Sequence, residues 1–364
     1  MSKIFELFGH QLTDTSEQAV HNRTNALCPF MQKKCDGGGN RHLSNINLVK
    51  KTELHQYFNE LDSVASGVCS LQLHSRETPW IVCPRRLMYL SNNLNKTTNF
   101  QLASLNHLWN LASYQRPARI GVWPELRISH KLDNKQFTYT FDYVLMPLSR
   151  ISQNHIENIL GIGWSGIRRT LEKSGYTIVR RGNTEFVEDF PSEYPLIVEI
   201  MTSSTSGGNK TKRSTIPMAV EDALLKTSHL APGINYRQVW ARMVSQLIVK
   251  SEVSISWGGK TVWVLQDKLV DYISDTTALN IHLFLSEHTD EVNILSLAYQ
   301  DDFENTDGVI ELSEGKLYAG PISSNPQSSA SFQDLIHAPL LPPISVLMSS
   351  VIKRYPKVVH SLDL

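Results

Sequence analysis

Four cysteines lie in the first quarter of this 364-residue chain, in the pattern C-x6-C-x33-C-x13-C. Thiolates are soft ligands that suit zinc or iron in tetrahedral geometry, and four of them close the coordination shell. A Gly-rich turn follows the second cysteine, and a proline follows the first and the fourth, so these residues lie at sharp corners of the backbone. The pattern predicts a structural metal site; the alternative is a set of buried thiols in a reducing compartment. The candidate ligands are Cys28, Cys35, Cys69 and Cys83.

Two acidic residues in apolar or alternating runs form a second candidate site. Glu199 interrupts the almost continuously apolar run 195–202, and Asp142 stands on the polar face of the alternating run 137–143. A buried carboxylate must be protonated, paired or bound to a cation. Two carboxylates on adjacent strands, with the Ile200 carbonyl, suit Mg²⁺, whose bound water can act as a nucleophile. The alternative is that both acids pair with Arg or Lys in the sheet.

A third acid lies on an earlier alternating run, residues 121–129. Glu125 shares a face with Arg127 in that run. From a neighbouring strand it is placed to orient the attacking water, or to contact a second cation in the two-metal arrangement of nucleases.

A basic loop, residues 202–215, follows Glu199 directly and combines hydroxyls, two glycines and three cations. Backbone amides, hydroxyls and cations of this kind meet the phosphates of nucleic acids. We therefore expect Lys210, Lys212 and Arg213 to contact DNA.

These residues must be positioned by a mixed α/β fold, because helical and strand periodicities alternate along the chain. Strands are expected at 68–73, 80–83, 121–129, 137–143, 195–202, 260–264 and 281–285, and helices at 50–61, 85–116, 151–175, 216–228 and 236–247. Residues 320–343 are expected to form a loop or extended tail.

The composition is that of a folded globular protein, with 41% apolar and 19% charged residues. Thirty-five Lys and Arg balance thirty-five Asp and Glu, so a polyanion must be met by a local basic patch. No run approaches the roughly 18–20 apolar residues of a membrane span. A soluble cytoplasmic protein is expected, in which the cysteines are thiols or metal ligands rather than disulfides.

The same residues resemble those of the NotI-type restriction endonucleases. The pieces that carry the resemblance run in the family's order over about the first 265 residues: FELFGH (5–10), CPF (28–30), GVC (67–69), WIVCPRR (80–86), PELRIS (124–129), FTYTFDYVL (137–145) and LIVEIMT (196–202). The combination of a cysteine tetrad with a later E...D...ExM series is specific, although each acid alone is a weak signal.

The resemblance implies a PD-(D/E)xK nuclease core with a mixed central sheet flanked by helices, and an N-terminal subdomain whose four cysteines bind iron. It implies a Mg²⁺-dependent homodimer that cuts both strands of a short palindromic DNA site and leaves 5′-phosphate and 3′-hydroxyl ends. A companion DNA methyltransferase is expected in the host. The catalytic acids fall on Glu125, Asp142 and Glu199, and the expected domains are 1–116, 117–290 and a C-terminal extension, 291–364.

One position departs from the family. The general motif has Lys, Gln or Glu two residues after the second acid, where this chain has Met201. The period of a strand places Met201 on the Glu199 face, directed into the site, but a thioether neither donates a proton nor carries charge. A cation from elsewhere is therefore expected, with Lys210 and Lys212 as candidates. The alternatives are a non-cleaving, metal-stabilised DNA-binding protein and a metal-dependent nuclease of repair or effector type.

Overall fold

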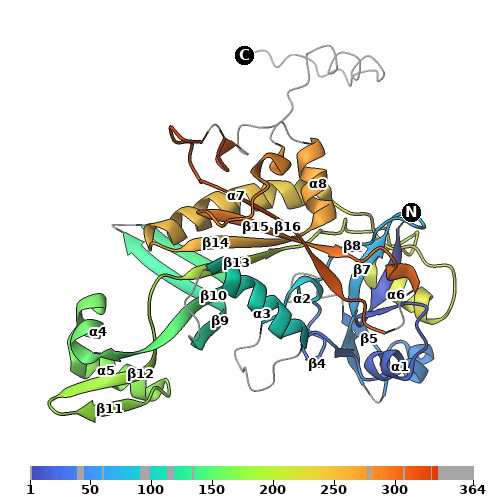
Figure 1. The fold of residues 1–364 in the computed structure, drawn as a ribbon. Coiled ribbons are helices and arrows are strands. Elements are labelled where there is room, and N and C mark those ends of the chain that lie inside the picture. Colours follow the sequence, from blue (N-terminus) through green and yellow to red (C-terminus); the bar gives the residue numbers. More distant parts are fainter. Residues whose placement is uncertain are drawn as a thin grey trace, which may run out of the picture.

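Alternating and apolar runs in the middle of the chain form a central mixed sheet with helices on both faces (Figure 1). The mixed α/β class expected from the sequence is confirmed. The computed structural model describes residues 2–38, 45–59, 61–90, 99–112, 119–132, 135–276, 280–305, 308–328 and 330–334.

The strand order of the central sheet is β11-β12-β10-β13-β14-β15-β16, with β9 paired to β10. Strands β9, β10 and β13 run antiparallel in succession; helix α7 (Tyr236–Ser256) then returns the chain, so that β14 lies parallel to β13. Every residue of β13 is buried, as is typical of a strand covered on both faces. The strands are β9 (Arg119–Leu132), β10 (Lys135–Ser152), β11 (Ile178–Arg181), β12 (Thr184–Pro191), β13 (Leu196–Met201), β14 (Lys260–Gln266), β15 (Val292–Tyr299) and β16 (Leu312–Gly320).

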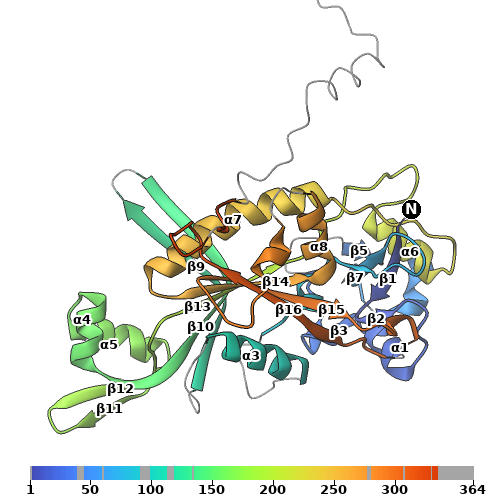
Figure 2. The same cartoon turned by 45° about the horizontal axis from the view of Figure 1, so that its top comes forward.

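An apolar core lies on each face of this sheet. Helices α7 and α8 cover one face, and α2 and α3 cover the other (Figures 1 and 2). Along β14, Trp263 and Leu265 pack beneath α7, whereas Val262 and Val264 pack with α3, as the period of a strand requires. The covering helices are α2 (Pro84–Leu87), α3 (Asn99–Ala112) and α8 (Asp267–Thr276).

The N-terminal residues form a second body, called here the N-terminal lobe. Its main sheet has the order β2-β1-β7-β8. Helix α6 belongs to it in space although it follows β13 in sequence: Ile216 and Val220 lie in one core with Ile4 and Leu7. The elements of the lobe are β1 (Lys3–Leu7), β2 (His10–Gln11), α1 (Glu17–Thr24), β3 (Leu27–Cys28), β4 (Lys33–Lys34), β5 (Asn45–Asn47), η1 (Thr52–Tyr57), β6 (Ser63–Ala65), β7 (Val68–Gln72), β8 (Trp80–Ile81) and α6 (Ile216–Leu224).

A buried ion pair joins this lobe to the central sheet. Arg86 Nε donates to Glu6 Oε1 at 2.9 Å, and both side chains are fully buried. The Tyr299 hydroxyl on β15 donates to Glu6 Oε2 at 2.6 Å, and Arg86 Nη2 donates to the Ile310 carbonyl at 2.7 Å. The carboxylate and the guanidinium thus hold three separate parts of the chain together.

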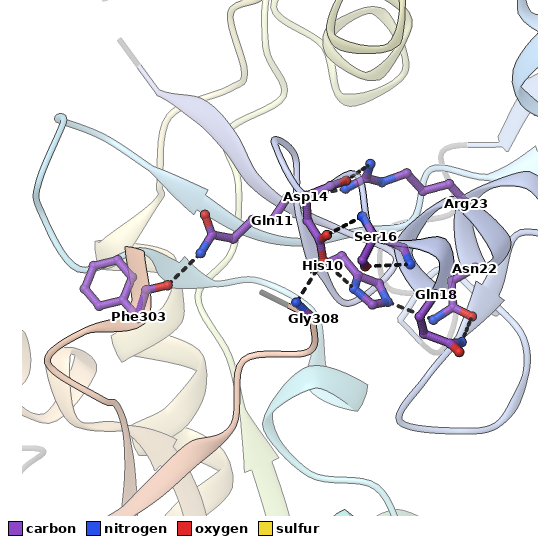
Figure 3. A network of polar contacts seen from close by, with 10 residues as sticks. His10, Gln11, Asp14, Ser16, Gln18, Asn22, Arg23, Phe303 and Gly308 are labelled. Atoms are coloured by element: carbon purple, nitrogen blue, oxygen red, sulfur yellow. Dashed lines mark hydrogen bonds and ion pairs between the residues drawn. The ribbon is translucent and has the colours of Figure 1, made fainter. Parts of the chain in front are cut away.

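A second polar network ties β2 to the segment between β15 and β16 (Figure 3). The Asp14 carboxylate contacts His10 Nδ1 at 3.1 Å and accepts the Gly308 amide at 3.0 Å, and Gln11 donates to the Phe303 carbonyl at 2.6 Å. Burial lowers the pKa of His10, which keeps the imidazole neutral near pH 7.

Helices α4 (Gln153–Leu160) and α5 (Trp164–Lys173) form, with β11 and β12, a small unit that projects from the sheet (Figure 1). Its own core contains Ile156, Ile167 and Val187. The single helix expected at 151–175 is broken because Gly161 takes a left-handed φ of 66° and caps α4.

Other expectations are corrected by the structure. Residues 281–285 form a 3₁₀ helix, η3 (Ile281–Phe284), rather than a strand, because its buried side chains are three residues apart. Strand β15, which follows the expected boundary at residue 290, pairs with β14 in the central sheet. The helix at 50–61 is reduced to η1, and much of the expected tail lies outside the described residues. In the described part of the chain, no helix has the length and apolar character needed to cross a bilayer.

The buried pair predicts a large loss of stability when one partner is removed. Arg86→Met leaves the Glu6 charge uncompensated, so we expect the free energy of unfolding to fall by about 3–5 kcal/mol. Arg119→Met is the matched control, because the Arg119–Asp189 pair is mostly exposed and its loss costs only ~0–1 kcal/mol. Urea unfolding measures both variants, and equal effects would contradict the structural role assigned to Glu6 and Arg86.

Candidate functional site

Strand β10 changes its pairing at Asp142. The registered pairs with β13 extend from Leu145 to Tyr143 and stop there. On the other side, Phe141 pairs with Leu126 of β9 and Tyr143 pairs with Pro124. Asp142 thus lies opposite Glu125, but these two residues are not a registered pair. Asp142 therefore lies where β10 is released from regular pairing with the strand on either side.

Side chains replace the missing ladder between β10 and β13. The Ile200 amide donates to Asp142 Oδ2 at 2.9 Å, and the Asp142 amide approaches Glu199 Oε1 at 3.4 Å. Each carboxylate thus contacts the main chain of the other strand. The two acids that the sequence indicated are brought together.

Glu199 is a buried acid in an otherwise apolar strand, with 2% of its side chain exposed. Burial, together with the neighbouring Asp142 charge, raises the pKa of Glu199 to about 7. Lys250 acts in the opposite direction: its Nζ lies 2.5 Å from Glu199 Oε2. A carboxylate that changes protonation near neutral pH beside a second acid is typical of a functional site.

Lys250 comes from helix α7, which covers this face of the sheet. It follows Met243 and Leu247 at helical spacing, and these two side chains lie fully buried in the core above β13 and β14. Lys250 is itself only 12% exposed, and its ammonium group lies 5.8 Å from the centroid of the Phe141 ring. Lys250 is not among the residues that the sequence indicated, although its place on the buried stripe of α7 is a signal that could have revealed it.

Glu125, the third predicted acid, has a different partner. Arg85 Nη2 donates to Glu125 Oε1 at 2.9 Å, and 63% of the Glu125 side chain is exposed. Its backbone φ of 50° is left-handed, which is uncommon for a residue other than glycine. Glu125 is therefore opposite Asp142 in register, while its carboxylate is bound by a guanidinium group.

Met201 contributes packing. Its side chain is 2% exposed and lies in the apolar cluster that contains Val239, Met243 and Trp263. It does share the α7 side of the sheet with Glu199, as expected, but it is enclosed by apolar neighbours rather than directed into an open site. The cation beside Glu199 is Lys250, in place of the expected Lys210 or Lys212.

The three cations of the basic loop differ in their pairing with acidic side chains. Arg213 is bound by Asp222 at 2.6 Å and by Glu221 at 3.2 Å, so its charge is balanced within the chain. Lys210 and Lys212 are exposed, and Lys212 lines a cavity of about 500 Å³ between this loop and residues 230–233.

The four predicted cysteine ligands lie together and surround a cavity of about 10 Å³, on the order of one water or one ion. All four are free thiols. Main-chain amides donate hydrogen bonds to three of the sulfur atoms. Such hydrogen bonds stabilise the negative charge of a thiolate. The amides of Phe30 and Met31 serve Cys28, those of Gly37 and Gly67 serve Cys35, and those of Arg85 and Arg86 serve Cys83.

The thiols nevertheless differ from one another. The hydrogen bond from Cys69 lowers the pKa of Cys83 and raises that of Cys69, and burial raises the pKa of Cys28 and, to about 12, that of Cys35. As the side chains stand in the described residues, no three His, Cys, Asp or Glu groups already have the spacing of a complete metal site. The donor set and the amide groups fit a soft metal, while closer convergence of the sulfurs would accompany binding.

Searches against protein-family models and against curated proteins found no match for this sequence.

Proposed function

We propose that this protein is a Mg²⁺-dependent endonuclease of double-stranded DNA whose hydrolytic site consists of Asp142, Glu199 and Lys250. The observation that carries the proposal is the pair of carboxylates held by cross-strand main-chain contacts at the interrupted ladder of β10 and β13, with a lysine 2.5 Å from the more buried one. A mixed sheet with this acidic pair at neighbouring strands, covered by the helix that carries the lysine, supports a PD-(D/E)xK type of core.

Asp142, Glu199 and the Ile200 carbonyl supply the hard oxygen ligands that a magnesium ion prefers. When bound, the ion supplies Lewis acidity at a phosphate oxygen and a water of lowered pKa. Asp142 is already oriented for this role by the Ile200 amide. Glu199 holds the Lys250 ammonium group at the site. If Glu199 were to bind a cation instead, Lys250 would be available to stabilise the charge that develops on a phosphate.

The cysteine site is proposed to be structural. Cys28, Cys35, Cys69 and Cys83 would hold iron, or zinc, and four thiolates close the shell of either metal and leave no position for a substrate. The metal would stabilise a region built mainly of short strands and turns. Homodimer formation, a palindromic target and a companion methyltransferase belong to the same proposal, as does cleavage to 5′-phosphate and 3′-hydroxyl ends.

Cleavage of plasmid DNA in the presence of Mg²⁺ is the first test. We expect discrete fragments from the wild type. Glu199→Gln should lose at least about 100-fold in rate and keep its affinity for DNA, because it removes a cation ligand without removing any phosphate contact. Glu172→Gln, on the exposed side of α5, is the matched control. Binding without cutting by the wild type would favour a DNA-binding protein, and nicks or a smear would favour a nuclease of repair or effector type.

The position of Lys250 predicts which lysine cleavage needs. Lys250→Ala should reduce the cleavage rate by about 10²–10³-fold, because it removes the cation that faces the reacting phosphate. Lys250→Arg should retain part of the rate. Lys210→Ala and Lys212→Ala serve as controls and should keep the rate at saturating DNA. If Lys250→Ala cuts as fast as the wild type, Lys250 is only a partner that offsets the buried charge of Glu199.

The raised pKa of Glu199 predicts a pH dependence. At low Mg²⁺, the cleavage rate should fall as the pH decreases through about 7, because a protonated Glu199 cannot bind the cation. The proton and the cation compete for the same carboxylate, so higher Mg²⁺ should move this acid limb to lower pH. Rates measured from pH 5.5 to 8.5 at several Mg²⁺ concentrations provide the check, and an acid limb that ignores Mg²⁺ would contradict the assignment.

A further inference from the structure

The segment that carries Cys83 is shared by the N-terminal lobe and the acidic site. Its main chain pairs with the lobe, where the Cys83 amide donates to the Cys69 carbonyl at 3.2 Å. Just before, the Ile81 carbonyl accepts the amide of Ser203, which follows β13, at 3.1 Å. Helix α2 begins directly after Cys83, contacts both β8 and β13, and lies between the lobe and the central sheet (Figure 1).

Arg85, in the first turn of α2, spans the distance between the cysteines and Glu125. Its Nε donates to Asp36 Oδ2 at 3.1 Å, and its Nη2 donates to Glu125 Oε1 at 2.9 Å. Asp36 directly follows Cys35, and the Arg85 amide itself points to the sulfur of Cys83. Arg85 is therefore fixed to the cysteine cluster by its main chain and by one half of its guanidinium group.

The other half of that guanidinium group holds a strained residue. Left-handed backbone at a residue other than glycine is strained and persists only where the surroundings enforce it. Glu125 has this conformation directly opposite Asp142. The Arg85 side chain is only 14% exposed, and its carbon Cζ lies 5.4 Å from the centroid of the Tyr89 ring, so the guanidinium group is itself well restrained.

We propose that Arg85 is a positioning residue that couples the cysteine centre to the hydrolytic site by holding Glu125 and the adjacent part of β9 opposite Asp142. This inference rests on the proposed function for the role of Asp142, which lies opposite Glu125, but the coupling itself is a property of the fold. A metal held by the four thiols would fix Cys35 and Cys83, and with them Asp36 and Arg85. Loss of the metal would release Glu125 without any change in the catalytic ligands.

Hydrogen exchange of β9 measures this coupling without reference to cleavage. In the metal-loaded protein we expect slow exchange in the peptide that covers residues 119–132. Removal of the metal with a chelator, and Arg85→Ala in the metal-loaded protein, should each accelerate exchange there by about tenfold or more. Chelation of the Arg85→Ala variant should add little, because the connection is already broken. Exchange in β14 should stay slow throughout, and Arg150→Ala, which removes an exposed pair with Glu188, is the control.

Two variants keep the test decisive if chelation unfolds the lobe. Asp36→Asn and Arg85→Lys, both assayed with metal bound and with metal content measured, each weaken one half of the connection and should give intermediate exchange in β9.

In cleavage assays Arg85→Ala should lower kcat with little change in KM for DNA, and Arg85→Lys should restore part of kcat. Unchanged β9 exchange in metal-loaded Arg85→Ala would overturn the coupling, whether or not the protein cleaves DNA. Failure to cleave DNA with accelerated β9 exchange would instead overturn the proposed function and leave the coupling in place.

Discussion

Burial of the Glu199 carboxylate in a strand that is otherwise apolar on both faces is the constraint on which the rest of the site depends. An isolated charge in such a place is costly, so the protein must protonate it, pair it or give it a cation. Here the pKa of Glu199 is raised to about 7 even with Lys250 beside it, so neither protonation nor pairing with Lys250 is complete near neutral pH. A carboxylate in this balance changes its protonation near neutral pH, which is typical of functional sites.

The fold creates this balance through an interrupted sheet. Because β10 leaves regular pairing at Asp142, main-chain amides and carboxylates meet where a ladder would have satisfied the amides alone. Helix α7 places the ammonium group of Lys250 beside Glu199. Helix α2 carries Arg85, whose guanidinium group binds Glu125. The N-terminal lobe is joined to the same sheet by the buried Glu6–Arg86 pair, so the cysteine cluster and the acidic pair belong to one connected body.

The sequence located the parts of the site that lie within single elements. Asp142 and Glu199 stood out because each interrupts a regular strand pattern, and the central mixed sheet followed from the same periodicities. Lys250 and Arg85 were missed, because their partners lie 51 and 40 residues away in the sequence and no local pattern encodes that distance. The sequence predicts a strand where the structure has η3, because Ile281, His282 and Leu283 alternate in polarity over a run too short to separate the strand period from the helical one. The left-handed conformation of Glu125 likewise depends on tertiary contacts.

The proposed function requires that Asp142 and Glu199 bind a divalent cation that displaces the ammonium group of Lys250. Crystals of the protein soaked in Mn²⁺, a substitute for Mg²⁺ with a measurable anomalous signal, test it most directly. We expect an anomalous peak in contact with both carboxylates and a Lys250 side chain withdrawn from Glu199. A Lys250–Glu199 pair that persists at high Mn²⁺, with no peak at Asp142, would contradict it.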